Sequence, residues 1–266
     1  MKVQQEWAKV MTRTEADDIL HDGETLWLAG EKSQAREAFR RARLTFHQSG
    51  DTVGEADALL QIGDLEAETG HTTSARESYV EARAIYAHAG DQRDQASVLV
   101  RLARLSQIDG NAKDAETCYL AALDIYESAS DHSGVGHVSR RLGHLERDAG
   151  RQDKALDRYR QALSHFRRAS DTLGEAHTLR SLATIARSLG QLDRAMADCD
   201  KAITLFREAG DLLGEAKATR AQAYILADEG NKAAAHKSMH HAAKLFARAG
   251  DTRSHDETEA EARTLS

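Results

Sequence analysis

Proline is absent from all 266 residues. Because proline removes a backbone donor and breaks helix interiors, its absence favours a chain that is nearly all α-helix. The two cysteines, Cys118 and Cys199, are too few for a disulfide framework and lack the C-x-x-C spacing of redox and metal sites. We expect both to be small apolar side chains in or near the core.

Long apolar runs and an excess of positive charge are also missing. No stretch approaches the roughly 20 apolar residues of a membrane helix, and the N-terminal MKVQQEWAKVMTRTEADDIL has no signal-peptide pattern. A formal net charge of −7 argues against a general binder of polyanions. We therefore expect a cytoplasmic protein with no membrane partner and without nucleic acid as its main ligand.

What the sequence does contain is a repeat of forty residues without a single insertion. GDTVGEADALLQIGDLEAETG at 50–70 returns as SDTLGEAHTLRSLATIARSLG at 170–190 and as GDLLGEAKATRAQAYILADEG at 210–230. Glycine recurs at 30, 70, 110, 150, 190 and 230. Alanine recurs at 35, 75, 115, 155, 195 and 235, and an aromatic residue at 46, 86, 126, 166, 206 and 246. Such a period predicts a stack of repeated helical or strand units.

Each repeat resolves into two helices. In the repeat at 51–90, Ala58, Ile62 and Leu65 share one face of a first helix that begins near Gly54. Gly70 then permits the left-handed turn that ends this helix.

The second helix of that repeat has its own apolar stripe. Thr72 or Thr73 is expected to cap its start, and Gly90 to end it before Asp91 caps the following helix. Small alanines in the stripe, with Gly63 on the first helix, are expected to let the two backbones approach closely. The stripe consists of Ala75, Tyr79, Ala82 and Tyr86.

These columns resemble the tetratricopeptide repeat. The match is a small residue in the middle of the first helix, a glycine at the turn, and an alanine–bulky–alanine pattern such as Ala155, Tyr159 and Ala162. The period departs from the usual length of about 34, and the proline that commonly ends the second helix is missing. The pattern is similar to the long-repeat subclass seen in kinesin light chains, cell-polarity adaptors and sensor regions of bacterial regulatory ATPases.

The resemblance implies an all-α solenoid, a right-handed superhelix of six stacked hairpins. It also implies a scaffold that binds peptides or protein segments on the concave surface of the first helices, without catalysis. Residues 1–10 are expected to be an N-terminal extension, 11–250 the repeats and 251–266 a polar C-terminal cap or tail. The repeats are expected at 11–50, 51–90, 91–130, 131–170, 171–210 and 211–250.

The face that should line the concave surface changes sign along the chain. The first two repeats place acids there and no base: Asp17, Glu24, Asp57 and Asp64. The last four repeats place bases there and no acid: Arg104, Arg140, Arg147, Arg180, Arg187, Lys217 and Arg220. His144 shares this face, and Trp27 and Tyr224 project onto it as candidate binding anchors.

Converging guanidinium groups suit carboxylates or phosphates, because they form bidentate, charge-assisted hydrogen bonds. The basic face therefore predicts a partly acidic peptide or protein ligand. Three alternatives stay open from the sequence. The arginines could be solvated or paired with acids such as Asp148 and Asp228; the acidic and basic ends could join copies of the chain head to tail; or the face could bind single-stranded nucleic acid, although stacking aromatics are lacking.

The motifs of catalysis and of cofactor binding are missing. The chain has no G-x-S-x-G, no phosphate loop and no H-E-x-x-H, so we expect no enzyme and no cofactor. His236 and His240 have the four-residue spacing that can hold a transition metal. No carboxylate or cysteine nearby in the sequence completes a site. We therefore expect no metal centre and place both histidines on the outer surface.

Overall fold

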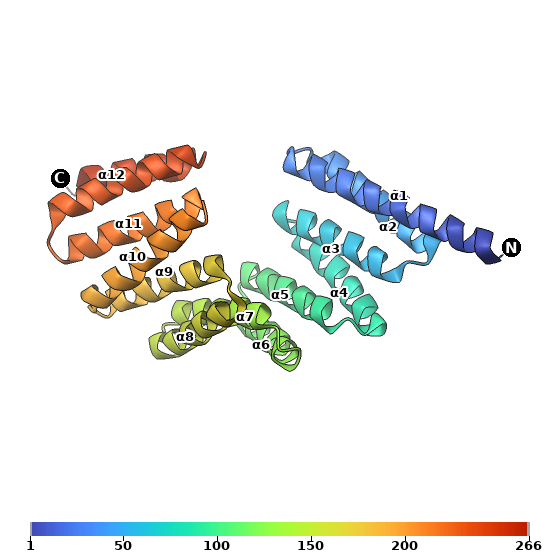
Figure 1. The fold of residues 1–266 in the computed structure, drawn as a ribbon, viewed down its shortest axis with the longest axis horizontal. Helices are drawn as coiled ribbons and strands as arrows, with labels where there is room; N and C mark the ends of the chain where they lie inside the picture. The colour runs from blue at the N-terminus through green and yellow to red at the C-terminus, as the bar shows by residue number, and fades with distance from the viewer. Residues whose placement is uncertain (1, 265–266) are drawn as a thin grey trace. The chain divides into compact units, whose positions relative to one another are not determined.

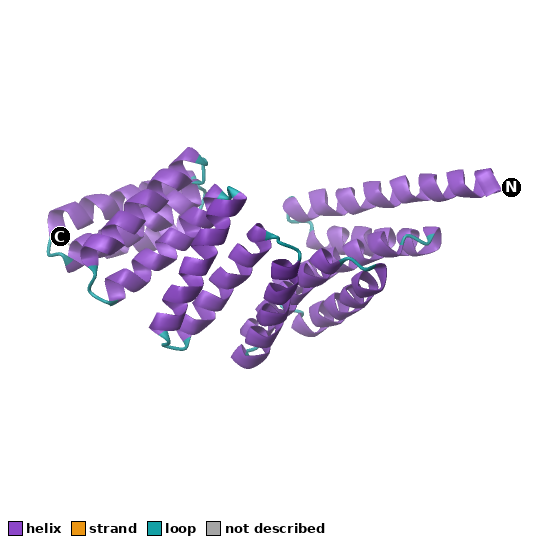
Figure 2. Cartoon of the chain, turned by 60° about the horizontal axis from the view of Figure 1, so that its bottom comes forward, coloured by secondary structure: helices purple, strands orange, loops and turns teal. Residues whose placement is uncertain are grey.

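The computed structural model describes residues 2–264, with side chains from residue 13 onward, and within that range its regular structure is entirely α-helical (Figures 1 and 2). The chain divides into two compact units, Met1–Ser130 and Asp131–Ser266. Unit 1 holds α1 (Lys2–Leu28), α2 (Lys32–Ser49), α3 (Thr52–Glu68), α4 (Thr72–Ala89), α5 (Gln92–Ile108) and α6 (Ala112–Ser128). Unit 2 holds α7 (His132–Asp148), α8 (Gln152–Ala169), α9 (Thr172–Ser188), α10 (Leu192–Glu208), α11 (Leu212–Asp228), α12 (Lys232–Arg248) and α13 (Thr252–Thr264).

Within each unit the helices pair as hairpins that stack in chain order. The pairs are α1 with α2, α3 with α4 and α5 with α6, and then α7 with α8, α9 with α10 and α11 with α12. In unit 2 the first helix α9 also touches the first helices α7 and α11. The first helices of unit 2 therefore form its inner layer, and α13 closes the stack against α12. The fold is the predicted all-α solenoid with a C-terminal capping helix.

The junctions between hairpins are closed by aspartates, as the sequence predicts for Asp91. Each of these aspartates is an N-cap whose Oδ1 accepts a hydrogen bond, of 2.7 to 3.1 Å, from the backbone N–H three residues later. Such a cap stabilises a helix by about 1 kcal/mol. The capping residues are Asp51, Asp91, Asp131, Asp171, Asp211 and Asp251.

The turn inside the hairpin differs in one respect from the prediction. Gly70 takes the expected left-handed conformation, with φ of 83°. The cap residue of α4 is His71, however, and no side chain caps this helix. The backbone already enters the helix at Thr72, one residue too early for the hydroxyl of Thr72 or Thr73 to serve as the cap. The predicted threonine cap is therefore wrong.

The core follows the predicted stripes. Ala75, Tyr79, Ala82 and Tyr86 are all buried, and the corresponding aromatic residues of the other hairpins are buried as well. Cys199 is buried and Cys118 partly so, and both are free thiols.

The small residues of the first helices serve a different purpose from the one expected. A Cβ at Gly63 would lie 2.5 Å from a ring carbon of Tyr79. A Cβ at Gly174 would lie 2.3 Å from the ring of Phe166, which belongs to the preceding hairpin. These glycines therefore make room for aromatic rings within and between hairpins, rather than for close backbone contact.

The two ends of the chain extend the helical stack. The backbone of residues 2–10 is part of α1, and the extension at 1–10 stays a prediction. At the other end α13 begins after the cap Asp251 and buries Thr258 and Ala262. It lies where the first helix of another repeat would lie, which explains how a polar segment can close the stack.

Candidate functional site

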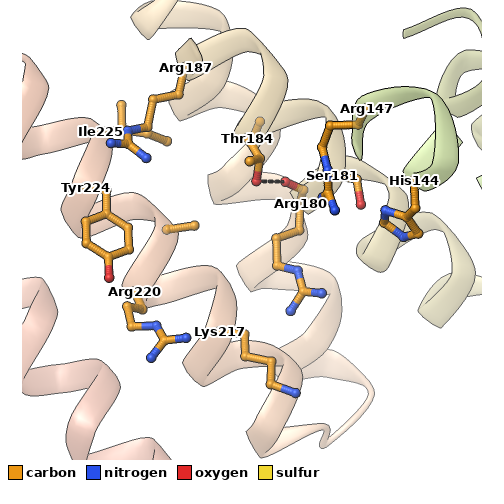
Figure 3. Close-up of a pocket in the computed structure, with 12 residues that line it drawn as sticks. His144, Arg147, Arg180, Ser181, Thr184, Arg187, Lys217, Arg220, Tyr224 and Ile225 are labelled. Atoms are coloured by element: carbon orange, nitrogen blue, oxygen red, sulfur yellow. Dashed lines mark hydrogen bonds between the residues drawn. The ribbon is translucent and has the colours of Figure 1, made fainter. Parts of the chain in front are cut away.

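A pocket of about 470 Å³ opens between the first helices of unit 2 (Figure 3). It collects most of the residues that the sequence assigns to a binding face. Those residues are His144 and Arg147 from α7, Arg180 and Arg187 from α9, and Lys217, Arg220 and Tyr224 from α11. Ser181 and Thr184 add hydroxyls, and Ala183, Ala221 and Ile225 add apolar surface.

The repeat explains why these side chains meet. Arg180 and Arg220 occupy the same position in successive repeats, so they stand side by side on neighbouring helices. Thr184 and Tyr224 lie one helical turn further along the same faces. Figure 3 shows Arg180 of α9 pointing into the space that Lys217 and Arg220 of α11 also enter.

The cations at the centre of the pocket have no acidic partner. Within residues 13–264, no carboxylate forms an ion pair with Arg180, Lys217 or Arg220. The Arg220 guanidinium instead donates to the Thr258 hydroxyl at 3.4 Å and lies 5.2 Å from the centre of the Phe246 ring. Burial lowers the pKa of Arg180; nearby Asp211 opposes this shift and Arg220 adds to it. The centre of the pocket therefore gathers three cations that have no ion-pair partner among residues 13–264, and Asp211 offsets part of the positive charge.

The cations at the edge of the pocket are neutralised. Arg147 pairs with Asp148 at 2.7 Å, and Arg187 pairs with Asp228 at 2.6 Å. The Arg187 guanidinium also lies 5.2 Å from the centre of the Tyr224 ring. The pairing alternative raised by the sequence thus describes the edge of the pocket but not its centre.

The histidines of this face carry no charge at neutral pH. Burial, followed by the nearby Arg140, lowers the pKa of His144 to about 3 and that of His177 to about 4. The Nδ1 of His144 lies 2.7 Å from the hydroxyl of Tyr159, which holds its ring in place. His144 therefore offers the pocket a neutral imidazole.

Arg140 stands apart from the other predicted residues. It belongs to the same column as Arg180 and Arg220, but it does not line the pocket. Its Nε is buried and has no hydrogen-bond partner. Burial, and then the positive charges of Arg141 and Arg180, lower the pKa of Arg140 to about 10. It remains protonated at neutral pH and adds to the positive potential of unit 2.

The two remaining predicted residues, Trp27 and Arg104, line a separate pocket of about 590 Å³ in unit 1. The indole N–H of Trp27 donates to Glu68 at 2.6 Å, and its ring meets Phe39 edge to face. Arg104 is exposed. The structure thus brings together seven of the ten predicted residues in unit 2 and two in unit 1.

The sequence reasoning missed how the acids of unit 1 are used. Asp64 accepts hydrogen bonds from the Tyr79 hydroxyl at 2.5 Å and from Arg101 at 3.0 Å. Asp57 accepts one from the Tyr86 hydroxyl. Asp64 and Arg101 are 37 residues apart, one repeat less one helical turn, and this separation was the available signal.

His236 and His240 are partly buried on α12, and the Nδ1 of His240 lies 2.8 Å from Glu259 of α13. Their placement on the outer surface stays a prediction. Among the described side chains, no group of three or more His, Cys, Asp or Glu residues could hold a metal ion. None of the helices in residues 2–264 is long and apolar enough to cross a membrane.

Comparison with solved structures places the fold. BtubC from P. vanneervenii is 18% identical, with a TM-score of 0.62 over 89% of this chain and 88% of that one. Aspartyl phosphate phosphatase F from Bacillus subtilis is 13% identical, with a TM-score of 0.71 over 99% and 73%. The Rap conjugation gene regulator of plasmid pLS20, solved with the Phr* peptide, is 17% identical, with a TM-score of 0.64 over 93% and 72%. At these identities the likeness concerns the fold alone.

Comparison with sequence families identifies the repeat itself. No curated protein matches the chain. Models of the tetratricopeptide repeat match residues 94–168 and 176–209, one stretch spanning parts of both units and the other within unit 2. These matches agree with the helical hairpins, the glycine turns and the alanine columns described above. The chain contains tetratricopeptide repeats, identified by the family models over residues 94–168 and 176–209.

Proposed function

We propose that the chain is a non-enzymatic scaffold whose unit 2 pocket binds an acidic segment of another protein. The observation that carries the proposal is the group formed by Arg180, Lys217 and Arg220, which have no carboxylate partner in the described residues. The repeat family is one of interaction modules. In addition, a solved structure of similar fold holds a peptide, the Phr* peptide of the pLS20 regulator.

The charge arrangement favours an anionic ligand. Burial disfavours the charged form of Arg180 and lowers its pKa, and the like charge of Arg220 acts in the same direction. A ligand carboxylate placed between Arg180 and Arg220 would remove the repulsion and form charge-assisted hydrogen bonds. A hydrogen bond to a charged group contributes about 1.5–3 kcal/mol.

The dimensions of the pocket suit a side chain rather than a flat surface. Its volume of about 470 Å³ lies within the usual range of ligand sites. Ala183, Ala221 and Ile225 supply apolar surface beside the cations. A glutamate, with two methylene groups below its carboxylate, matches this combination of apolar wall and positive charge.

The repeat also predicts a spacing for the acids of the ligand. Arg180 and Arg220 stand on two successive first helices, and packed helices lie roughly 8–10 Å apart. An extended or polyproline-II peptide advances about 3.1–3.3 Å per residue, so every third residue reaches the next helix. We expect the best ligands to carry an acid at every third position.

The pocket is poorly suited to catalysis. An acid or base works best when its pKa lies near the operating pH. The pKa of His144 is lowered to about 3, and burial together with the Glu261 hydrogen bond raises that of Tyr224 to about 12. Neither group exchanges protons readily near neutrality, so we assign binding and no reaction to this site.

The test is fluorescence anisotropy with a labelled peptide of repeated Glu-Gly-Ser triplets. The wild-type chain should bind it, and the double variant Arg180→Glu, Arg220→Glu should bind about 100-fold more weakly, because two charged hydrogen bonds are lost. A peptide with lysine in place of glutamate should not bind. A peptide of alternating Glu and Gly should bind less well than the triplet peptide.

The matched control is Arg160→Glu, Arg168→Glu on α8, which makes the same charge change at exposed positions outside the pocket. This control should retain affinity within about threefold, since exposed charges act weakly and are screened by salt. Equal losses in the two double variants would show that only net charge matters and would overturn the proposal. So would unchanged binding by the Arg180→Glu, Arg220→Glu variant.

Head-to-tail self-assembly is a weaker candidate than peptide binding. It needs free carboxylates on unit 1 to meet the arginines of another copy. Asp57 and Asp64 are already bound by the Tyr86 and Tyr79 hydroxyls, and Glu24 accepts a hydrogen bond from Gln61. A salt-sensitive oligomer in sedimentation experiments would reverse this ranking. A gel shift with single-stranded RNA would do the same for nucleic acid binding.

A further inference from the structure

Two histidines on α12 direct the same ring atom toward each other. The Nε2 atoms of His236 and His240 are 3.2 Å apart, and the two rings are nearly perpendicular, at 82°. The residues are four apart in a helix, so they stand one above the other on one face. This geometry places the two Nε2 atoms within hydrogen-bonding distance of each other.

A carboxylate from the capping helix orients one of these rings. Glu259 of α13 lies 2.8 Å from the Nδ1 of His240. A carboxylate accepts, so Nδ1 carries the proton and the Nε2 of His240 is left with its lone pair. Metal-binding histidines almost always donate their other ring N–H to such a carboxylate or to a backbone carbonyl. Glu259 lies nineteen positions beyond His240, too far along the chain for the spacing of the histidines to indicate it.

The separation of the two nitrogens matches a shared metal ion. Zinc binds imidazole nitrogen at about 2.0–2.1 Å, so two nitrogens at a tetrahedral angle lie roughly 3.3 Å apart. The 3.2 Å between His236 and His240 is therefore close to the distance that a bound ion requires. The side chains of His240 and Glu259 are 37% and 25% exposed, so an ion can reach them from solvent.

We propose that His236 and His240 bind a divalent transition-metal ion of the kind that prefers imidazole, such as Zn²⁺, with Glu259 orienting His240. Without metal, the Nε2–H of His236 donates to the Nε2 of His240, and the ion takes the place of that proton. His236 then carries its proton on Nδ1. Water completes the coordination, because the described side chains supply no third ligand.

The site has a structural consequence that is independent of the peptide pocket. Glu259 belongs to α13, whereas both ligands belong to α12. Fixing the ring of His240 strengthens its bond to Glu259 and so ties the capping helix to the last hairpin. Metal binding should therefore slow the opening of α13 more than that of any helix of unit 1.

The experiment is isothermal titration of the full chain with ZnCl₂ after treatment with chelator. We expect one equivalent bound by the wild type. His240→Gln should abolish binding, and Glu259→Gln should weaken it about 10–100-fold, as loss of an orienting partner does. The matched control is His241→Gln, an exposed histidine beside the site, which should bind zinc as the wild type does.

Hydrogen exchange read by mass spectrometry provides a second readout. Zinc should slow exchange in residues 252–264 of the wild type and leave them unchanged in His240→Gln. Circular dichroism shows whether each variant is folded, and His236→Gln serves as a second ligand variant if His240→Gln is not. Zinc binding that survives the double change His236→Gln, His240→Gln would place the ion on other histidines and overturn the proposal. Absence of binding to the wild type at millimolar zinc would overturn it as well.

Discussion

In unit 1 the hydroxyls of Tyr79 and Tyr86 on α4 donate to Asp64 and Asp57 on α3. In unit 2 the positions that correspond to Tyr86 hold phenylalanines, and two of these rings meet histidines edge to face. Phe166 lies 4.9 Å from His137 and Phe206 lies 4.8 Å from His177, measured between ring centres. The two units therefore use one repeat to build inner faces of different chemistry.

The comparison distinguishes charged residues that stabilise the fold from charged residues that are available to a ligand. In unit 1 the acids of the inner face complete hydrogen bonds of buried tyrosines, so they belong to the fold. In unit 2 the arginines of the inner face satisfy no buried acid, and Arg180 and Arg220 repel each other. The change from acidic to basic residues along the inner face thus has two causes: the acids of unit 1 support the fold, whereas the arginines of unit 2 are available to a ligand.

The largest expected effect comes from removing one inner-face charge in each unit. Asp64→Ala should lower the free energy of unfolding by about 2 kcal/mol, because it leaves the Tyr79 hydroxyl and the Arg101 guanidinium without their acceptor. Arg180→Ala should change it by no more than about 0.5 kcal/mol. Urea denaturation followed by circular dichroism measures both. A cost for Arg180→Ala as large as that for Asp64→Ala would make Arg180 a structural residue and erase the distinction.

The next largest effect is the loss of folding stability as the pH is lowered. The pKa values of His144 and His177 in the folded state, about 3 and about 4, lie below the ordinary value near 6.5. The unfolded chain therefore takes up protons first, so stability is complete above pH 6.5 and falls as the pH is lowered toward 4. The slope cannot exceed about 1.4 kcal/mol per pH unit for each histidine, and contact with solvent reduces it.

Urea denaturation of the wild type and of His144→Gln, His177→Gln at pH 7, 6 and 5 tests this expectation. The double variant should lose less stability between pH 7 and pH 5 than the wild type. The control is His88→Gln, His241→Gln, two exposed histidines whose removal should leave the pH dependence unaltered. Parallel curves for the wild type and His144→Gln, His177→Gln would contradict the assignment of neutral histidines to unit 2.

The smallest effect comes from introducing a tyrosine–aspartate pair of unit 1 into unit 2. The double change His137→Asp, Phe166→Tyr should form a hydrogen bond like that between Tyr86 and Asp57, since the positions correspond across two repeats. We expect the double variant to be about 1 kcal/mol more stable than the sum of the single changes predicts. A double-mutant cycle from urea denaturation measures this coupling. A coupling of zero would mean that the two units differ in backbone arrangement as well as in side chains.

Most of the fold can be predicted from the sequence because the same pattern of small, aromatic and turn residues recurs in six repeats. The columns of alanine and aromatic residues predicted the buried stripes, and Asp91 was correctly identified as a cap. The cap at Thr72 failed because the helix there begins one residue earlier than the hydroxyl requires. Such a shift depends on local backbone geometry, which hydrophobic spacing does not determine.

The sequence predicts which residues share the site better than it predicts which of them are paired with acids. Residues forty apart occupy equivalent positions on successive first helices, which predicts that Arg180 and Arg220 lie together, and the structure has both in one pocket. The sequence offers Asp148 and Asp228 as possible partners without deciding whether they pair, and the structure pairs Arg147 with Asp148 and Arg187 with Asp228. Comparison of equivalent positions also omits Arg101, which stands three positions before the column to which Arg104 belongs.

Side-chain contacts between neighbouring first helices occur at fixed separations along the sequence. Pairs occur at 37 residues, as for Gln61 with Glu24, and at 41 residues, as for Arg187 with Asp228. Each separation is one period shifted by a turn or by a single residue. The separation of 37 residues also joins Asp64 to Arg101, the pair that comparison within columns does not reveal.

Every hairpin boundary is built in the same self-sufficient way. A glycine, or Ser130 and Ser170 with φ of 55°, turns the chain, and the aspartate that follows closes a bond only three residues long. The turn and the cap therefore recur at each boundary whatever side chains the adjoining hairpins carry. The packing across a boundary is specific, as Gly174 against Phe166 shows, so an inserted forty-residue segment would need matching residues at both of its ends.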